Sequence, residues 1–150
     1  LQLQEKIVSH FASDKRVQLF FFGGGLHEKK IIEQWVIKYP TTQSVVGKMS
    51  MNEELLLMSQ LDIMYSMDSA NMHLASLVDT PVVSIWGSTH PYAGFLGWNQ
   101  SPDNVIQFEL PCRPCSIFGQ KPCYRQDYAC MHGIKPEMVI EKMQSILKLI

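Results

Sequence analysis

The chain has 150 residues, of which 46% are hydrophobic and 18% charged, and its formal net charge is -1. This composition is typical of one globular domain with a buried core and excludes an intrinsically disordered chain. The scattered basic residues exclude a nucleic-acid-binding surface, and the apolar runs are far shorter than the ~20 residues that cross a bilayer. The sequence opens at Leu1 inside a helical pattern, with no initiator methionine and no signal peptide, so we expect a fragment of a longer protein.

Short apolar runs alternate with amphipathic segments along the chain. One of the predicted helices begins with Ser50 and carries Glu53 three residues later, which is the pattern of a capping box. In chain order, we expect a helix around residues 3–11, a strand over 16–23, a helix over 26–39, a strand over 44–49, a helix over 50–61, a strand over 62–67, a helix over 69–79, strands over 80–87 and 104–110, and a last helix over 135–150.

Strands that alternate with helices predict right-handed crossovers and a parallel sheet. We therefore expect an α/β fold, a Rossmann-like parallel sheet with helices on both faces, in a single domain over residues 1–150. Two long connections, residues 88–103 and 111–134, interrupt this regular pattern. Long loops in compact domains are usually functional or mobile.

The turn at "MDSANMH" (residues 67–73) is the first candidate ligand site. In open α/β sheets, ligands lie outside the carboxyl ends of the strands, where helix N-termini present unpaired N–H groups. With Ser69 as N-cap, the amides of Ala70, Asn71 and Met72 would suit a phosphate. Asp68 would repel a phosphate but can accept hydrogen bonds from sugar hydroxyls, and His73 can donate one from the same helical face. Together these groups indicate a nucleotide sugar.

The same turn also has a purely structural interpretation. Asp68 and Ser69 can be a helix cap without a ligand, and His73 can be a histidine packed in the core. The spacing of these residues alone favours neither interpretation.

A second candidate site follows the first strand at "FFGGGLHEKK" (residues 21–30). The three glycines are typical of a phosphate loop, but Glu28 stands where the third glycine of a dinucleotide-binding motif belongs. Glu28 can instead accept hydrogen bonds from a ribose, or it can be a favourable acid in the first turn of a helix. Met49 ends the next predicted strand, where it can pack in the core or contact an adenine.

Four cysteines, Cys112, Cys115, Cys123 and Cys130, lie in one loop over residues 111–134. The first pair has the spacing of metal ligands, and the second pair does not repeat it. Three alternatives remain for this loop: a structural zinc site, disulfides, or free thiols. A cytosolic protein argues against stable disulfides.

Four segments together, "GGGLHEK", "VVGKMSMNEELLLMSQLD", "MDSANMHLASLVDTPVVSIWGSTHP" and "CRPC…CM…IKPEMV", resemble family nine glycosyltransferases, such as the ADP-heptose:lipopolysaccharide heptosyltransferases. The resemblance runs from about Leu19 to the end of the chain. It implies the C-terminal, donor-binding domain of a GT-B enzyme, whose two Rossmann-like domains face each other. Ala70 and Asn71 depart from the glycine and proline that the family signature has at these positions.

The resemblance implies a role for each candidate residue. Asp68 and His73 would contact the heptose and the diphosphate, and the amides of Ser69 and Ala70 would bind the phosphates. Glu28 would hold the ribose, and Met49 would lie beside the adenine. Ser69 and His73 would stabilise the leaving group.

The resemblance also implies the activity of the whole enzyme. A base from an N-terminal acceptor domain would activate a glycan acceptor of the lipopolysaccharide core, which displaces ADP with inversion. The chemistry would require no cofactor, since the ADP-sugar donor is a substrate, and this fragment alone would be inactive. The enzyme would be bacterial and cytoplasmic, at the inner membrane as a peripheral protein.

Two alternatives to this function remain. One is another GT-B enzyme, such as a nucleotide-sugar epimerase or a transferase with a different donor. The other is a non-catalytic α/β interaction module, in which the cysteine loop and the aromatic residues Tyr92, Phe95 and Trp98 form a protein-binding surface. Packing of these aromatic residues onto the sheet is the structural interpretation of the same pattern.

Overall fold

The structure, a computed structural model, describes residues 2–149. The chain divides into two compact units, Leu1–Leu57 and Met58–Ile150, and each is described here by itself. The prediction that residues 1–150 form one donor-binding domain stays a prediction. Residue 150, the last of the predicted C-terminal helix, lies outside the described residues.

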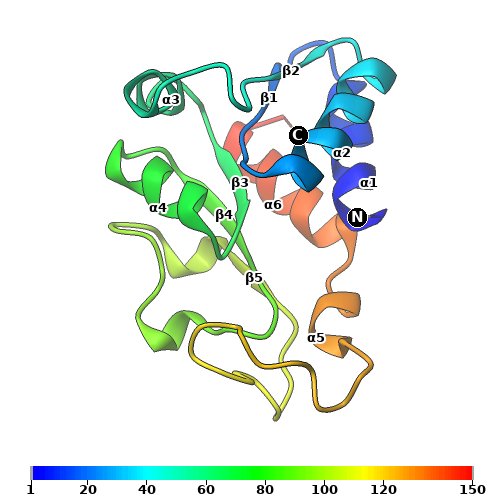
Figure 1. The fold of residues 1–150 in the computed structure, drawn as a ribbon, viewed down its shortest axis with the longest axis vertical. Coiled ribbons are helices and arrows are strands. Elements are labelled where there is room, and N and C mark those ends of the chain that lie inside the picture. Colours follow the sequence, from blue (N-terminus) through cyan, green and yellow to red (C-terminus); the bar gives the residue numbers. More distant parts are fainter. Residues whose placement is uncertain (1, 150) are drawn as a thin grey trace. The chain divides into compact units, whose positions relative to one another are not determined.

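The first unit pairs two short parallel strands with helices (Figure 1). Strand β1 runs beside β2, with Leu19 opposite Thr42. In chain order its elements are α1 (Gln2–Ala12), β1 (Leu19–Phe21), α2 (Leu26–Lys38), β2 (Thr42–Ser44) and α3 (Met51–Met58), whose last residue falls in the second unit.

Helices α1 and α2 contribute buried apolar side chains to the first unit. Ile7 and Phe11 of α1 and Ile32 of α2 are buried. The ring of Trp35 in α2 lies 5.7 Å from that of Phe21 in β1, centroid to centroid. The predicted helices over 3–11 and 26–39 are confirmed, whereas the helix predicted over 50–61 is shorter and covers Met51–Met58.

The second strand of this unit differs from its prediction. We expected residues 44–49 to form it, but the hydrogen-bonded pairing covers Thr42–Ser44. Val45 and Val46 follow this strand and are buried, although Val45 still donates to the carbonyl of Phe21 at 3.1 Å. Gly47, with φ of 67°, then turns the chain. The apolar residues Val45 and Val46 are therefore buried without belonging to the strand, whereas the residues of β2 that pair with β1 are polar.

The second unit contains a parallel sheet in the order β3-β4-β5. Strand β4 lies in the middle, with Met67 of β3 opposite Ile85 and Ile106 of β5 also opposite Ile85. The elements are β3 (Met64–Met67), α4 (Ala70–Leu77), β4 (Val82–Trp86), the 3-10 turns η1 (Pro91–Ala93) and η2 (Pro102–Asn104), β5 (Val105–Gln107), α5 (Ala129–His132) and α6 (Pro136–Leu147).

Helices cover both faces of this sheet, as predicted. Figure 1 shows α4 and α6 on opposite sides of the three strands, and both pack against β4. All five residues of β4 are buried, and the side chain of Trp86 donates to the hydroxyl of Ser84 at 2.9 Å. Strands buried on both faces are typical of parallel α/β sheets. Among the helices of residues 2–149, none combines the length and the apolar character that crossing a membrane requires.

Candidate functional site

Asp68 begins a sharp turn at the carboxyl end of β3, just before α4. Its backbone N–H donates to the carbonyl oxygen of Ile85 at 3.2 Å, which anchors the turn to β4. Asp68 is half-buried, and Ser69 follows as the N-cap residue of α4 with extended dihedral angles, φ of -155° and ψ of 171°. The turn therefore lies where α/β proteins bind their ligands.

The hydroxyl of Ser69 does not cap the helix. It lies 3.0 Å from the hydroxyl of Ser66, a buried residue of β3 that also donates to the carbonyl of Met67 at 2.9 Å. The N–H of Met72 donates to the carbonyl of Ser69 at 3.1 Å, so the prediction that this amide is open to a ligand is wrong. Ser66 was not predicted, because a serine inside an apolar strand gives no sign of what its hydroxyl contacts.

Ala70 and His73 are both exposed on the first part of α4. Within residues 2–149, the amides of Ala70 and Asn71 have no hydrogen-bond acceptor. The imidazole and the half-buried carboxylate of Asp68 are not sealed in the core, so the interpretation of His73 as a core histidine is wrong. The helix N-terminus leaves donors free for an anionic ligand.

Glu28 and Met49 belong to the first unit. Glu28 is exposed in the first turn of α2, and its Oε2 accepts a hydrogen bond from the N–H of Gly24 at 3.0 Å. This carboxylate thus organises the glycine loop before the helix. Met49 is 39% exposed, between β2 and α3, and is not core packing.

The six predicted donor-site residues therefore form two groups. Asp68, Ser69, Ala70 and His73 lie together on one turn of the second unit. Glu28 lies in the first turn of α2 and Met49 lies between β2 and α3, both in the first unit. A single donor site that uses all six stays a prediction.

The cysteine loop packs against the end of β4. The N–H of Cys115 donates to the carbonyl of Ser88 at 2.8 Å. A cavity of about 420 Å³ lies beside this contact. Its lining includes Ser88, Cys115, Lys121, Cys123, Tyr128 and Cys130.

Among the described residues no disulfide joins any two of these four cysteines, so the alternatives of a zinc site and of free thiols both stay predictions. Cys130 is buried and the other three are half-buried. Burial raises the pKa of the Cys115 thiol, and the neighbouring thiols raise it further. Within the described part of the chain, no three His, Cys, Asp or Glu side chains are placed to hold one metal ion. A zinc site therefore stays a prediction that requires the thiols to approach one another further.

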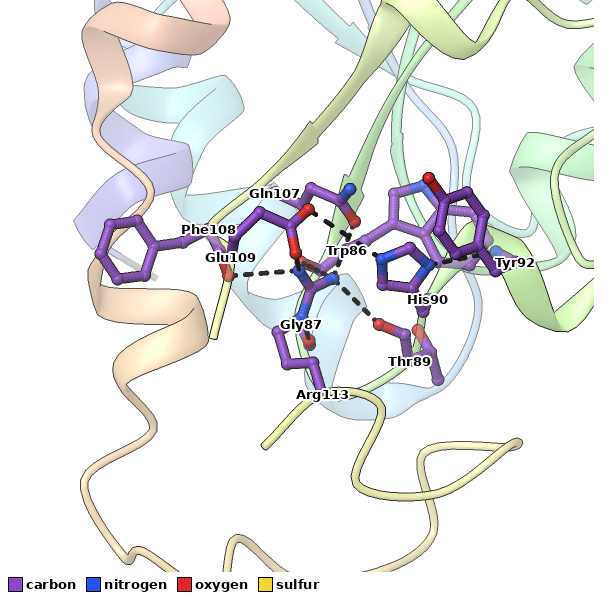
Figure 2. Close-up of polar contacts among 9 residues, drawn as sticks. All are labelled: Trp86, Gly87, Thr89, His90, Tyr92, Gln107, Phe108, Glu109 and Arg113. Atoms are coloured by element: carbon purple, nitrogen blue, oxygen red, sulfur yellow. Dashed lines mark hydrogen bonds and ion pairs between the residues drawn. The ribbon is translucent and has the colours of Figure 1, made fainter. Parts of the chain in front are cut away.

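A cluster of polar contacts that begins in this loop was not predicted from the sequence (Figure 2). Its centre is the side chain of Arg113, which is 0% exposed. His90 is buried; its Nδ1 accepts the N–H of Tyr92 at 3.1 Å, and its Nε2 lies 4.0 Å from Glu109. In the sequence, Arg113 is one charged residue in a loop, and only the folded chain brings its acceptors together.

The aromatic residues of the loop after β4 divide into two kinds. Tyr92 and Trp98 are 95% and 77% exposed. Phe95 is half-buried, with its ring 5.5 Å from that of Phe118 in the cysteine loop, centroid to centroid. Packing therefore explains Phe95, whereas Tyr92 stays exposed although its ring lies 4.4 Å from that of His90, centroid to centroid.

Comparisons with known proteins identify related chains. The model of "Glycosyltransferase family 9 (heptosyltransferase)" matches residues 6–124. A lipooligosaccharide heptosyltransferase 2 of Campylobacter jejuni is 32% identical over 87 residues, which are 58% of this chain and 26% of that protein.

Two solved structures share the fold. An E. coli ADP-heptose lps heptosyltransferase II has a TM-score of 0.65 and 16% identity, over 99% of this chain and 40% of that chain. The E. coli heptosyltransferase WaaC with ADP has a TM-score of 0.67 and 16% identity, over 97% of this chain and 38% of that chain. The present chain thus spans less than half of each of these relatives. Because the family model matches most of its residues, the chain belongs to glycosyltransferase family 9.

Proposed function

We propose that this chain is the donor-binding part of a heptosyltransferase that uses an ADP-activated heptose. The observation that carries the proposal is the Asp68 turn, where a carboxylate, free helix amides and an exposed imidazole lie together at the carboxyl end of β3. Membership of family 9 and the likeness to an E. coli ADP-heptose heptosyltransferase and to an E. coli heptosyltransferase with ADP support the same donor.

Each group of the turn has a role in this proposal. Asp68 accepts hydrogen bonds from hydroxyls of the sugar. The amides around Ser69 and Ala70 bind the diphosphate, because the N-terminus of a helix carries a partial positive charge. Glu28 holds the ribose, and Met49 lies against the adenine.

The reaction of the whole enzyme is a single displacement with inversion. A base outside this chain removes the proton of an acceptor hydroxyl in the lipopolysaccharide core, the oxygen attacks C1 of the heptose, and ADP leaves with the bonding electrons. His73 and the helix amides stabilise the negative charge on the leaving phosphate. One such donor is worth roughly 3 to 4 kcal/mol in other enzymes. These groups act without a metal, and the chain alone binds the donor without turning it over.

The acceptor sets where the whole enzyme works. A lipopolysaccharide core acceptor places it in the cytoplasm, as a peripheral protein at the inner membrane.

Calorimetry with ADP-heptose, ADP, GDP and UDP tests the proposal. We expect binding of ADP-heptose and ADP but not of GDP or UDP. Asp68→Ala should weaken ADP-heptose about tenfold more than ADP, because it removes a charged acceptor from the sugar. Asp62→Ala, an exposed carboxylate before β3, is the matched control and should change neither affinity. If Asp68→Ala weakens ADP-heptose and ADP equally, Asp68 does not bind the sugar.

The exposure of Tyr92 and Trp98 favours a second candidate, a protein-binding surface on the loop after β4. Aromatic residues are enriched at the cores of protein interfaces. A chain that gives no thermal shift with any ADP-, GDP- or UDP-sugar would favour this candidate. A shift with a GDP- or UDP-sugar would instead favour another GT-B transferase or an epimerase.

A further inference from the structure

The guanidinium of Arg113 joins the cysteine loop to the ends of two strands (Figure 2). Its Nε donates to the carbonyl of Gly87 at 2.6 Å, and its Nη1 donates to that of Phe108 at 3.1 Å. Its Nη2 reaches three acceptors: the carbonyls of Trp86 at 3.3 Å and Thr89 at 3.0 Å and the side chain of Gln107 at 2.9 Å.

This site is built for an arginine. A buried charge is costly unless it is paired and hydrogen-bonded. Here the side chain is 0% exposed, and the nearest carboxylate, Glu109, lies 3.8 Å away and is itself 70% exposed. Backbone carbonyls therefore supply most of the compensation. The five N–H donors of a guanidinium can serve these acceptors, whereas the compact ammonium of a lysine cannot span them.

The carbonyls that Arg113 binds lie next to the anchor of the Asp68 turn. Trp86 and Gly87 directly follow Ile85, and the carbonyl of Ile85 accepts the N–H of Asp68 at 3.2 Å. A shift of the segment after β4 would therefore move the acceptor that holds Asp68. The bond from Cys115 to Ser88 adds a second attachment of the cysteine loop to this segment.

We propose that Arg113 is a positioning residue for the donor: it fixes the end of β4, which in turn holds the Asp68 turn in its binding conformation. The cysteine loop thus takes part in donor recognition without touching the donor. The inference rests on the proposed function, because it concerns the same turn.

Two variants and one matched control test it. Arg113→Lys keeps the charge and Arg113→Gln removes it. Arg125→Gln changes an exposed arginine of the same loop, whose side-chain hydrogen bonds within residues 2–149 all go to Asp127. Each is compared with the parent chain by circular dichroism and then by amide hydrogen exchange in NMR. We expect both Arg113 variants to speed exchange of the Asp68 amide, about tenfold or more, and Arg125→Gln to leave it unchanged. Unchanged exchange in Arg113→Lys would overturn the inference, even if Arg113→Gln fails to fold.

A double-mutant cycle then links Arg113 to the donor. Calorimetry measures the Kd of ADP-heptose for Arg113→Lys, for Asp68→Ala and for the double variant. If Arg113 acts through Asp68, the single changes each cost about tenfold and the double variant loses little more than Asp68→Ala alone. Losses that multiply would mean a general structural role and would overturn the inference. If the parent chain itself binds no ADP-heptose, the proposed function fails, and the role in donor binding fails with it, whatever the exchange result.

Discussion

The side chain of Gln100 accepts the backbone N–H of Val82 at 2.8 Å and so pairs a loop residue with the first residue of β4. The same amide donates to the carbonyl of Thr80 at 3.0 Å. We expect Gln100→Ala to lower the free energy of unfolding by about 1 to 3 kcal/mol, because it leaves two partly buried backbone groups without partners. Urea denaturation measures the loss. Gln34→Ala, at an exposed position of α2, should lower the free energy of unfolding far less. Equal losses in the two variants would contradict this role of Gln100.

Tyr65 of β3 has a buried hydroxyl with no hydrogen-bond partner among residues 2–149. An unsatisfied buried hydroxyl costs roughly 1 to 3 kcal/mol, so Tyr65→Phe should keep or raise the thermal midpoint. Tyr92→Phe, at a 95% exposed position, is the control and should have no effect. A clear loss of stability in Tyr65→Phe would indicate an ordered water on the hydroxyl.

The same residue predicts a dependence on alkaline pH. Burial raises the pKa of Tyr65 above its ordinary value. The folded state therefore favours the neutral phenol, and its contribution is complete below the pKa of the unfolded chain, about 10, and is lost as the pH rises above it. Urea denaturation between pH 8 and about 11 should show a steeper fall for the parent chain than for Tyr65→Phe. Parallel curves would contradict the raised pKa.

Ser50 and Glu53 form a reciprocal cap at the start of α3. The N–H of Ser50 donates to Glu53 Oε2 at 2.7 Å, and the N–H of Glu53 donates to the hydroxyl of Ser50 at 3.4 Å. Ser50→Ala should lower the free energy of unfolding by about 1 kcal/mol.

The hydrogen bonds from Ser50 also lower the pKa of the Glu53 carboxyl group. The stability that this carboxylate contributes is therefore present at neutral pH and is lost as the pH falls through that lowered pKa. Urea denaturation at neutral and at acid pH should therefore show a smaller difference between Ser50→Ala and the parent chain in acid.

The sequence predicts such a cap well because the cap is local. Two residues three positions apart specify it, and the same holds for the amphipathic period of α2 and the apolar run of β4. The strand around Val45 was misplaced because its side chains report burial, whereas the ladder depends on a partner strand. The four-residue helix Ala129–His132 is too short to show a period.

In the candidate site, too, contacts between residues close in sequence could be predicted, whereas contacts between residues far apart in sequence could not. The Asp68 turn follows from residues adjacent in sequence, so its position at the end of a strand could be predicted. Arg113 binds carbonyls 24 to 27 residues away at Thr89, Gly87 and Trp86. Backbone carbonyls are the same in every sequence, so no pattern of side chains could indicate that these would surround a guanidinium.

The free cysteines predict a thiol count and a reactivity order. Freshly reduced protein should titrate with four thiols, and Cys115 should be alkylated more slowly at neutral pH than the other half-buried cysteines, because burial raises its pKa and less thiolate is present. Mass spectrometry after brief iodoacetamide treatment gives the order. One equivalent of bound zinc in the same protein would contradict free thiols and support the metal alternative.

The three tryptophans sit in such different surroundings that the chain carries its own set of fluorescent reporters. Trp98 is 77% exposed, Trp86 is fully buried, and Trp35 packs on Phe21 in the first unit. Acrylamide should therefore quench the red edge of the emission from Trp98 and spare the blue emission of Trp86. Because the carbonyl of Trp86 is one of those that Arg113 binds, loosening of the cysteine loop should be visible as a red shift from this one indole.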